Sequence, residues 1–387
     1  MIRNLVSINI AELFERMAYY GVRSILLLFL TKSLLWSKLD AAEVYGWFTM
    51  SIYFISILGG LAADLSRLPF LMAIIGNSFG TAGILVLAFS GSPLMVYAGL
   101  GMLAFGSGMY KPAIVAGLYR ASFTYRHRFD FIYTIFYVAI NIGAFVAPLL
   151  IGGIGDTGNP EDFRTGFLVA AGISLIPTAL LLINYKSLTK NDLEYNNASF
   201  RLTEIDVTNI VLWFLISIVF WIGYEIYPLY TNASSSASSQ LLMVFVTMVT
   251  YIVLLPLNLI RNFRSALKIA IGLALTALAT SLIPMLHLPT GAGLLTLAIA
   301  ETMVAPILIS QLIQNSSPRF TATISGAFMA ITLLTNKLSG IMTNASPDDW
   351  PFNQYLITGI CLVLLTALVL IDRAQKKREQ QSAQQLF

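Results

Sequence analysis

The sequence predicts an all-α membrane protein with twelve transmembrane helices in two six-helix bundles and both termini in the cytoplasm. Three observations lead to this fold class. Of the 387 residues, 57% are hydrophobic and 11% are charged, with a mean hydropathy of +0.77, whereas soluble domains carry about 25% charged residues. The apolar residues form long runs with short connections, and lysine and arginine gather in alternate connections. Together these features exclude a soluble protein.

A membrane-spanning helix needs about 20 mostly apolar residues, and twelve runs reach that length. They cover 5–31, 42–63, 69–90, 93–118, 130–153, 165–185, 208–231, 239–260, 267–287, 291–313, 321–343 and 352–372. The longest connection follows the sixth run. We therefore expect an N-terminal bundle at 1–188, a cytoplasmic linker at 189–206, a C-terminal bundle at 207–375 and a cytoplasmic tail at 376–387.

The orientation follows from the positive residues, which favour the cytoplasmic side of a membrane. With the N-terminus inside, the inner connections hold sixteen lysines and arginines, whereas the outer ones hold Lys32, Lys38 and Arg164. These connections explain the net charge of +4 without a nucleic-acid partner. The first run is too long and too charged for a cleaved signal peptide. One cysteine and two isolated histidines make neither a disulfide framework nor a metal site.

The first apolar run carries charges where the bilayer would be. Glu12, Arg16, Tyr19 and Arg23 fall within an arc of about 60° on a helix, with Glu15 beside it. A charge at membrane depth costs about 2.5–3.5 kcal/mol or more, so it normally faces a cavity and has a partner. This helix is therefore expected to present a polar face to the interior of the protein.

Four more ionisable residues lie deep within the predicted spans, away from their ends: Lys111, Glu225, Glu301 and Lys337. Glu12 and Lys111 lie at similar depths from the inner side, and Arg23 and Glu225 at similar depths from the outer side. Glu12 could therefore pair with Lys111, and Arg23 with Glu225. Such pairs could also be purely structural and fix helix register, and Lys337 could extend its ammonium group to the surface. Eight ionisable residues in five helices favour a functional cavity over register alone.

Beyond the first apolar run, four local motifs combine small, aromatic or polar residues within or at the end of a predicted span. They are Gly59-Gly60-Leu61-Ala62-Ala63-Asp64, Lys111-Pro112, Phe136-Tyr137-Val138-Ala139-Ile140-Asn141-Ile142-Gly143, and Phe220-Trp221-Ile222-Gly223-Tyr224-Glu225. At these residues the chain resembles the proton-dependent oligopeptide transporter (POT) family, a branch of the major facilitator superfamily. The pattern E-x-x-E-R-x-x-Y-Y-G is matched at every defined position by Glu12 through Gly21. Glu301 with Pro306, and Gly326 through Lys337, extend the resemblance over nearly the whole chain.

The resemblance implies a major facilitator fold with a central substrate site between the two bundles. Arg16 and Lys111 would hold the terminal carboxylate of a peptide, and Glu301, helped by Asn141, would face its amino terminus. Three tyrosines, Tyr19, Tyr20 and Tyr53, would line the pocket. The proton-coupling carboxylates would be Glu12, Glu15 and Glu225, and Arg23 would meet Glu225 in an outer gate. No cofactor is implied beyond the proton as coupling ion.

The residues themselves agree with that implication. A zwitterionic ligand needs a cation and an anion held apart, and the predicted cavity offers both. If a substrate carboxylate recruits Arg16 and Lys111, the glutamates lose their partners and bind a proton more easily. Linkage makes the effect reciprocal. The expected function is proton-coupled import of di- and tripeptides by alternating access. The expected location is a bacterial inner membrane. Small peptides are the expected substrate and membrane lipid the other partner, and no oligomer is implied.

The chain departs from the family pattern at four positions, where Ala113, Ile226, Ala305 and Phe328 replace the usual asparagine, glutamine, serine and tryptophan. A relative that carries a non-peptide small solute is therefore an alternative. A non-transporting membrane sensor is an alternative from another class. An enzyme is not expected, because no nucleophile–base set or metal cluster lies at membrane depth.

Overall fold

The computed structural model describes residues 2–190, 195, 207–231, 237–260, 265–287, 289–344, 356–361 and 363–364. In these ranges all the regular structure is helical. The chain divides into two compact units, one made of residues 1–207 with 312–333 and the other of 208–311 with 334–387. The predicted tail at 376–387 and most of the predicted linker lie outside the described residues.

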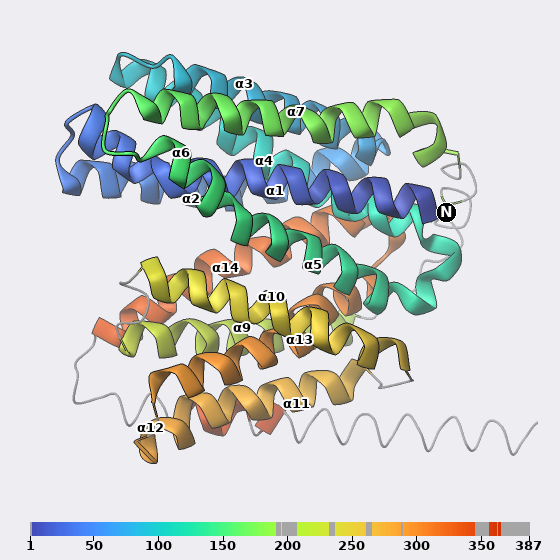
Figure 1. Cartoon of the computed structure of the whole chain (residues 1–387). Coiled ribbons are helices and arrows are strands. Elements are labelled where there is room, and N and C mark those ends of the chain that lie inside the picture. Colours follow the sequence, from blue (N-terminus) through green and yellow to red (C-terminus); the bar gives the residue numbers. More distant parts are fainter. Residues whose placement is uncertain are drawn as a thin grey trace, which may run out of the picture. The chain divides into compact units, whose positions relative to one another are not determined.

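The N-terminal unit contains helices at each of the first six predicted spans (Figure 1). They are α1 (Ile2–Leu28), α2 (Lys38–Ser66), α3 (Pro69–Ala88), α4 (Pro93–Ala121), α5 (Phe129–Ala147) and α7 (Asp162–Leu188). The fifth span changes character at Pro148, whose missing N–H ends the α-helical pattern. A π-helical turn at Pro148–Gly152 and the short α6 (Gly153–Gly155) complete it.

Local sequence sets where these helices begin. Ser37 caps α2 by accepting from the Asp40 backbone N–H at 3.1 Å, and Ser92 caps α4 by accepting from the Met95 N–H at 3.4 Å. Pro69 and Pro93 occupy first-turn positions, where a missing N–H costs nothing. The first helical residues of α2, α3 and α4 are therefore specified locally.

The helices of this unit pack in the spatial order α2, α4, α3, α7, α1 and α5. Glycines allow the closest crossings. A Cβ on Gly106 of α4 would collide with the backbone of α3 at Gly76 and Gly80, and one on Gly143 of α5 would meet the Leu13 carbonyl of α1. Small residues permit such close approach between helices in membranes. The Gly143 crossing places α5 directly against the charged turns of α1.

The rest of the chain contains α9 (Val207–Tyr230), α10 (Ala237–Ile260), α11 (Ser265–Ala277), α12 (Ile283–Met285), α13 (Thr290–Asn315) and α14 (Thr321–Asn344). All of these residues except Val207 and 312–333 belong to the C-terminal unit. A π-helical turn at Leu278–Leu282 joins α11 to α12. These elements match the predicted spans from the seventh to the eleventh. The predicted twelfth span, 352–372, lies mostly outside the described residues. The parts of it that the structure describes, 356–361 and 363–364, are helical.

Within the described ranges, eight helices are long and apolar enough to cross a bilayer by themselves. The charged α1 is not among them, because every stretch of membrane length in it includes Glu12, Glu15 and Arg16. Nor is α4, which carries Lys111 and is diluted by glycine and serine. Helices α1 and α4, which carry the most distinctive predicted site residues of the N-terminal unit, are thus not among the helices that are apolar enough to cross a bilayer by themselves.

The first turns of α14 belong to the N-terminal unit, and Asp64 at the end of α2 explains why. Its carboxylate accepts the backbone N–H groups of Ala322 at 3.1 Å and Thr323 at 2.7 Å, and the Thr323 hydroxyl at 2.7 Å. The first N–H groups of a helix have no partner within the helix, so a carboxylate there is stabilising. A Cβ on Gly60 would collide with the Ala322 backbone, so glycine allows this contact.

Candidate functional site

Helix α1 places three of its charged residues inside the N-terminal unit. The side chains of Glu12, Glu15 and Arg16 are 0%, 4% and 3% exposed. The Arg16 Nε lies 3.4 Å from Glu12 Oε1 and donates a hydrogen bond to Glu15 Oε2. One guanidinium therefore faces two carboxylates, and the three groups together carry a net negative charge when all are ionised. We call Glu12, Glu15 and Arg16 the α1 cluster.

Glu12 is less well satisfied than its neighbour. Among the described residues, neither of its carboxylate oxygens accepts a hydrogen bond, and the Nη2 of Arg16 has no acceptor. A buried charge without hydrogen bonds is costly. The α1 cluster can therefore still accept one proton, or bind an anion that would contact Arg16.

Lys111 of α4 lies next to this cluster but makes no ion pair with any described residue. It is close enough to interact electrostatically with Glu12, Glu15 and Arg16. Equal depth in the sequence suggested a Glu12–Lys111 pair, whereas in the structure the ion-pair partner of Glu12 is Arg16, one turn along its own helix. Lys111 is therefore a nearby cation rather than the direct partner of Glu12.

Tyrosines continue the polar face of α1 beyond the cluster. Tyr19 lies between two guanidiniums, with its ring centroid 4.9 Å from the Arg16 Cζ and 5.7 Å from the Arg23 Cζ, and packs edge-on against Tyr20 at 5.3 Å. Arg23 also donates from Nε to the Tyr45 hydroxyl at 2.8 Å. Tyr53 of α2 is close enough to Arg23 to interact with it electrostatically.

Asn141 is buried in α5, and its Nδ2 donates to the Tyr137 carbonyl of the same helix at 2.9 Å. Sequence reasoning missed three tyrosines of this unit: Tyr45, Tyr110 and Tyr133. Tyr110 and Tyr133 are buried near Glu12, and Tyr110 has no hydrogen-bond partner for its hydroxyl among the described residues. The position of Tyr110 directly before Lys111 was the only signal for it.

The C-terminal unit holds a second polar cluster, centred on Glu301 of α13. Its Oε2 accepts from the Tyr224 hydroxyl at 2.8 Å and the Thr247 hydroxyl at 3.3 Å. Tyr251 donates to the backbone carbonyl of Glu301 at 3.3 Å. We call Glu301, Tyr224, Thr247 and Tyr251 the α13 cluster; it joins three helices, and of its members only Glu301 was singled out as a site residue.

Glu225 follows Tyr224 in α9 and interacts electrostatically with Glu301. Arg23, its predicted gate partner, belongs to the N-terminal unit. The predicted site residues therefore separate into an N-terminal group, which comprises Glu12, Glu15, Arg16, Tyr19, Tyr20, Arg23, Tyr53, Lys111 and Asn141, and a C-terminal group of Glu225 and Glu301.

Comparison with known proteins places this pattern in a family. The model of the Major Facilitator Superfamily matches residues 8–336. The chain belongs to the major facilitator superfamily. Members of this superfamily are transporters, so the expectation that the chain is not an enzyme is confirmed.

The similar curated proteins are distant relatives. The uncharacterized transporter YclF of Bacillus subtilis is 31% identical over 177 residues, which are 44% of this chain and 35% of that protein. Dipeptide and tripeptide permease A of Pectobacterium carotovorum is 29% identical over 175 residues, which are 45% of this chain and 33% of the permease. The matched segments thus span about a third of these relatives.

Solved structures match over the whole fold. A crystal structure of the peptide transporter POT with sulfate is 18% identical with a TM-score of 0.66, and covers 96% of this chain and 94% of its own. A POT family transporter in complex with 5-aminolevulinic acid is 15% identical with a TM-score of 0.62, and covers 95% of this chain and 96% of its own. This superfamily member therefore has the POT fold, and the resemblance to that family is confirmed at the level of distant relatives.

Proposed function

We propose that this superfamily member is a proton-coupled symporter that imports di- and tripeptides by alternating access. The observation that carries the proposal is the α1 cluster, in which two buried carboxylates share one guanidinium beside an additional cation, Lys111. A peptide carboxylate is the ligand chemistry that matches Arg16 and Lys111. Glu301, held by two hydroxyl donors, is the matching anion for the amino terminus.

Coupling follows from the shared counter-ion. A substrate carboxylate that engages Arg16 and Lys111 withdraws positive charge from Glu12 and Glu15, so that one of these carboxylates takes up a proton. By linkage, prior protonation must favour substrate binding by the same factor. In the proposal, Glu12 is the first acceptor because it has the weaker hold on Arg16. Glu15 and Glu225 are the further coupling carboxylates, and Arg23 and Glu225 form the outer gate.

Binding measured at several pH values tests this coupling directly. Purified wild type should bind dialanine more tightly as the pH falls from about 8 to about 5, because protons and substrate bind cooperatively. Lys111→Gln should weaken binding across that range, whereas Lys186→Gln, at an exposed lysine of the same unit, should bind as wild type does. Affinity that is independent of pH with Lys111 intact would reject the shared counter-ion.

A second candidate is a small zwitterion other than a peptide. It is favoured by the four departures from the family pattern at Ala113, Ile226, Ala305 and Phe328, and by the structural relative solved with 5-aminolevulinic acid. Competition separates the two candidates: a dipeptide should displace bound 5-aminolevulinic acid from a peptide transporter, and should fail to do so in the alternative. Binding without accumulation would indicate a sensor.

The proposal includes twelve spans with both termini in the cytoplasm of a bacterial inner membrane. Sixteen predicted inner cations against three outer ones support it. It also keeps the bundles at 1–188 and 207–375, joined by the linker at 189–206. A C-terminal green fluorescent protein fusion should fluoresce and an alkaline phosphatase fusion should be inactive. An active phosphatase fusion would contradict this topology.

A further inference from the structure

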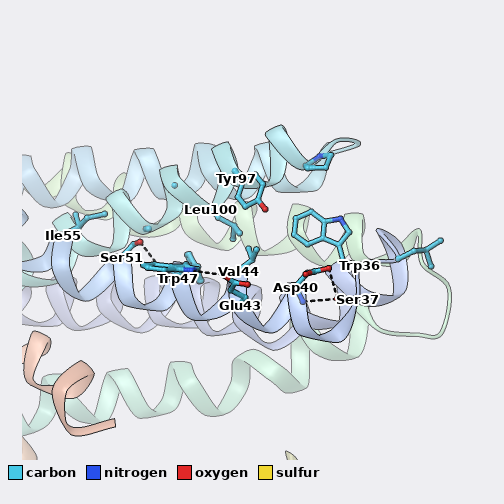
Figure 2. A pocket seen from close by; sticks show the side chains of 15 residues that line it. Trp36, Ser37, Asp40, Glu43, Val44, Trp47, Ser51, Ile55, Tyr97 and Leu100 are labelled. Carbon is cyan, nitrogen blue, oxygen red and sulfur yellow. Dashed lines mark hydrogen bonds between the residues drawn. The ribbon is translucent and has the colours of Figure 1, made fainter. Parts of the chain in front are cut away.

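A groove with a volume of about 800 Å³ lies between α2 and α4 in the N-terminal unit. It begins at the N-terminal ends of both helices and continues along α2 from Ser37 to Ile55 (Figure 2). At 1.5 Å per residue that stretch of helix is about 27 Å long. None of the residues that line the groove belongs to the α1 cluster.

One end of the groove is acidic and aromatic. Asp40 and Glu43 are the charged residues that line it, and both are exposed carboxylates. Around them lie Trp36, Trp47 and Tyr97 (Figure 2). Trp36, which lies just before α2, contacts Tyr97 of α4 with the ring centroids 6.0 Å apart.

The two carboxylates differ in how they are engaged. Asp40 accepts the Ser37 hydroxyl at 2.7 Å and so takes part in capping α2. Among the described residues, Glu43 accepts only from the Trp47 indole N–H, at 3.4 Å, a long hydrogen bond. Glu43 is therefore the anion of the groove that is available to a ligand, and Trp47, which is 61% exposed, holds an open aromatic face beside it.

The opposite end of the groove is apolar. Phe48, Ile55, Leu100 and Ala104 line it without a charged residue. The hydroxyl of Ser51, which also lines this part, donates to the Trp47 carbonyl of its own helix at 2.8 Å. Its polarity therefore changes along the helix axis, from carboxylates near the helix ends to hydrocarbon deeper in the span. A lipid of a bilayer has the same gradient, with its head group at the interface and its chain toward the middle. A water-soluble ion would not use the apolar half.

We propose that this groove binds an aminophospholipid of the surrounding bilayer. Its primary ammonium group is held by Glu43 among Trp36, Trp47 and Tyr97, and an acyl chain lies along Ile55 and Leu100. Aromatic faces attract ammonium groups, and a carboxylate accepts their hydrogen bonds. Two carboxylates disfavour anionic head groups, and a quaternary ammonium cannot donate to Glu43.

Native mass spectrometry of the purified full chain, titrated with single lipids, tests this site without a transport assay. Wild type should retain phosphatidylethanolamine in preference to phosphatidylglycerol and phosphatidylcholine. Glu43→Gln and Tyr97→Leu should each reduce phosphatidylethanolamine retention by about threefold or more. Tyr97→Leu keeps both carboxylates and so tests the aromatic contribution separately. Glu161→Gln removes an exposed carboxylate outside the groove and should retain lipid as wild type does.

A parallel titration with dodecylamine separates the lipid from a simple hydrophobic cation. Tighter retention of phosphatidylethanolamine than of dodecylamine, lost in both groove variants, supports the proposal. Equal retention of all three lipids by wild type would overturn it. Retention that is unchanged in both variants, or restricted to dodecylamine, would overturn it as well.

Discussion

Arg16 is the central residue of the proposed N-terminal site, because its guanidinium contacts two carboxylates at once. A lysine in its place would carry the same charge but has no planar fork with which to face both. Arg16→Lys should therefore lower peptide uptake in proteoliposomes by about tenfold or more. Arg3→Lys, at an exposed arginine of the same helix, should have no effect. Wild-type uptake by Arg16→Lys would show that charge alone suffices.

A substitution at Tyr224 tests the α13 cluster, also at the scale of a single residue. Tyr224→Phe deletes the hydroxyl that donates to Glu301 and changes little else. If Glu301 must be held in place to bind an amino group, peptide affinity should fall by about tenfold, which corresponds to the loss of one hydrogen bond to a charged group. Equilibrium binding of dialanine measures this directly.

The matched control is Tyr227→Phe. Tyr227 lies in the same unit and donates its hydroxyl hydrogen to the Thr290 carbonyl at 3.2 Å instead of to Glu301. It should leave affinity unchanged. Equal weakening in both variants would mean that the effect is one of packing and not of Glu301.

At the scale of single residues, the sequence identified the buried charged residues but was less informative about which side chains they contact. Helical periodicity alone places Glu12 and Arg16 one turn apart, and the structure shows them as an ion pair. The donors of Glu301 come from positions 77 and 54 residues away in the chain. No local pattern indicates which hydroxyls of other helices will meet a buried carboxylate, because tertiary packing decides it.

At the scale of elements, Asp64 holds the first turn of α14. Asp64→Ala would leave the N–H groups of Ala322 and Thr323 without this acceptor. Loss of a helix cap costs about 1–2 kcal/mol. The thermal unfolding midpoint in detergent should therefore fall. Asp156→Ala, which breaks the exposed ion pair with Lys32, should cost less than about 1 kcal/mol. A larger loss in Asp156→Ala than in Asp64→Ala would contradict this role.

Tyr195, in the connection between the two predicted bundles, is an anchor that sequence reasoning missed. It is 2% exposed, donates to the Pro318 carbonyl at 2.6 Å, and lies against Phe123 and the Arg120 guanidinium. Burial raises the pKa of its hydroxyl well above the ordinary value. The neutral, donating form is therefore the one that the folded chain favours.

Tyr195→Phe should lower the free energy of unfolding by about 1 kcal/mol at neutral pH. Because the folded pKa is raised, this contribution is complete below the unfolded tyrosine pKa of about 10. It then declines as the pH rises toward the folded value. The difference in unfolding midpoint between wild type and variant should stay constant from about pH 6 to 9 and shrink at higher pH. A difference that grows with pH would contradict the burial effect.

The limits of prediction at the scale of elements have a physical cause. Apolar run length predicted a helix at each of the first eleven spans, because membrane thickness fixes that length. The capping of α14 by Asp64 joins positions 258 and 259 residues apart, and the helix motif at Gly59–Asp64 gave no sign of its partner. Contacts of that range depend on how the helices pack.

At the scale of the whole molecule, the chain forms two compact units whose membership does not follow chain order alone. Residues 312–333 belong with the N-terminal half, although the predicted division is a simple cut in the linker at 189–206. The Asp64 cap and a hydrogen bond from Gln314 to Asp130 at 2.9 Å account for this assignment. Helix counting gives the number of elements in each half but not these contacts.

Proton-driven uptake into proteoliposomes tests the proposed symport most directly, with wild type, Glu12→Gln and the exposed control Glu161→Gln. Wild type and the control should accumulate dialanine when an inward proton gradient is imposed. Glu12→Gln should lose this accumulation but keep peptide exchange without a gradient, since Arg16 and Lys111 remain to bind substrate. Gradient-driven accumulation by Glu12→Gln equal to that of wild type would contradict the assignment of Glu12 as the coupling carboxylate.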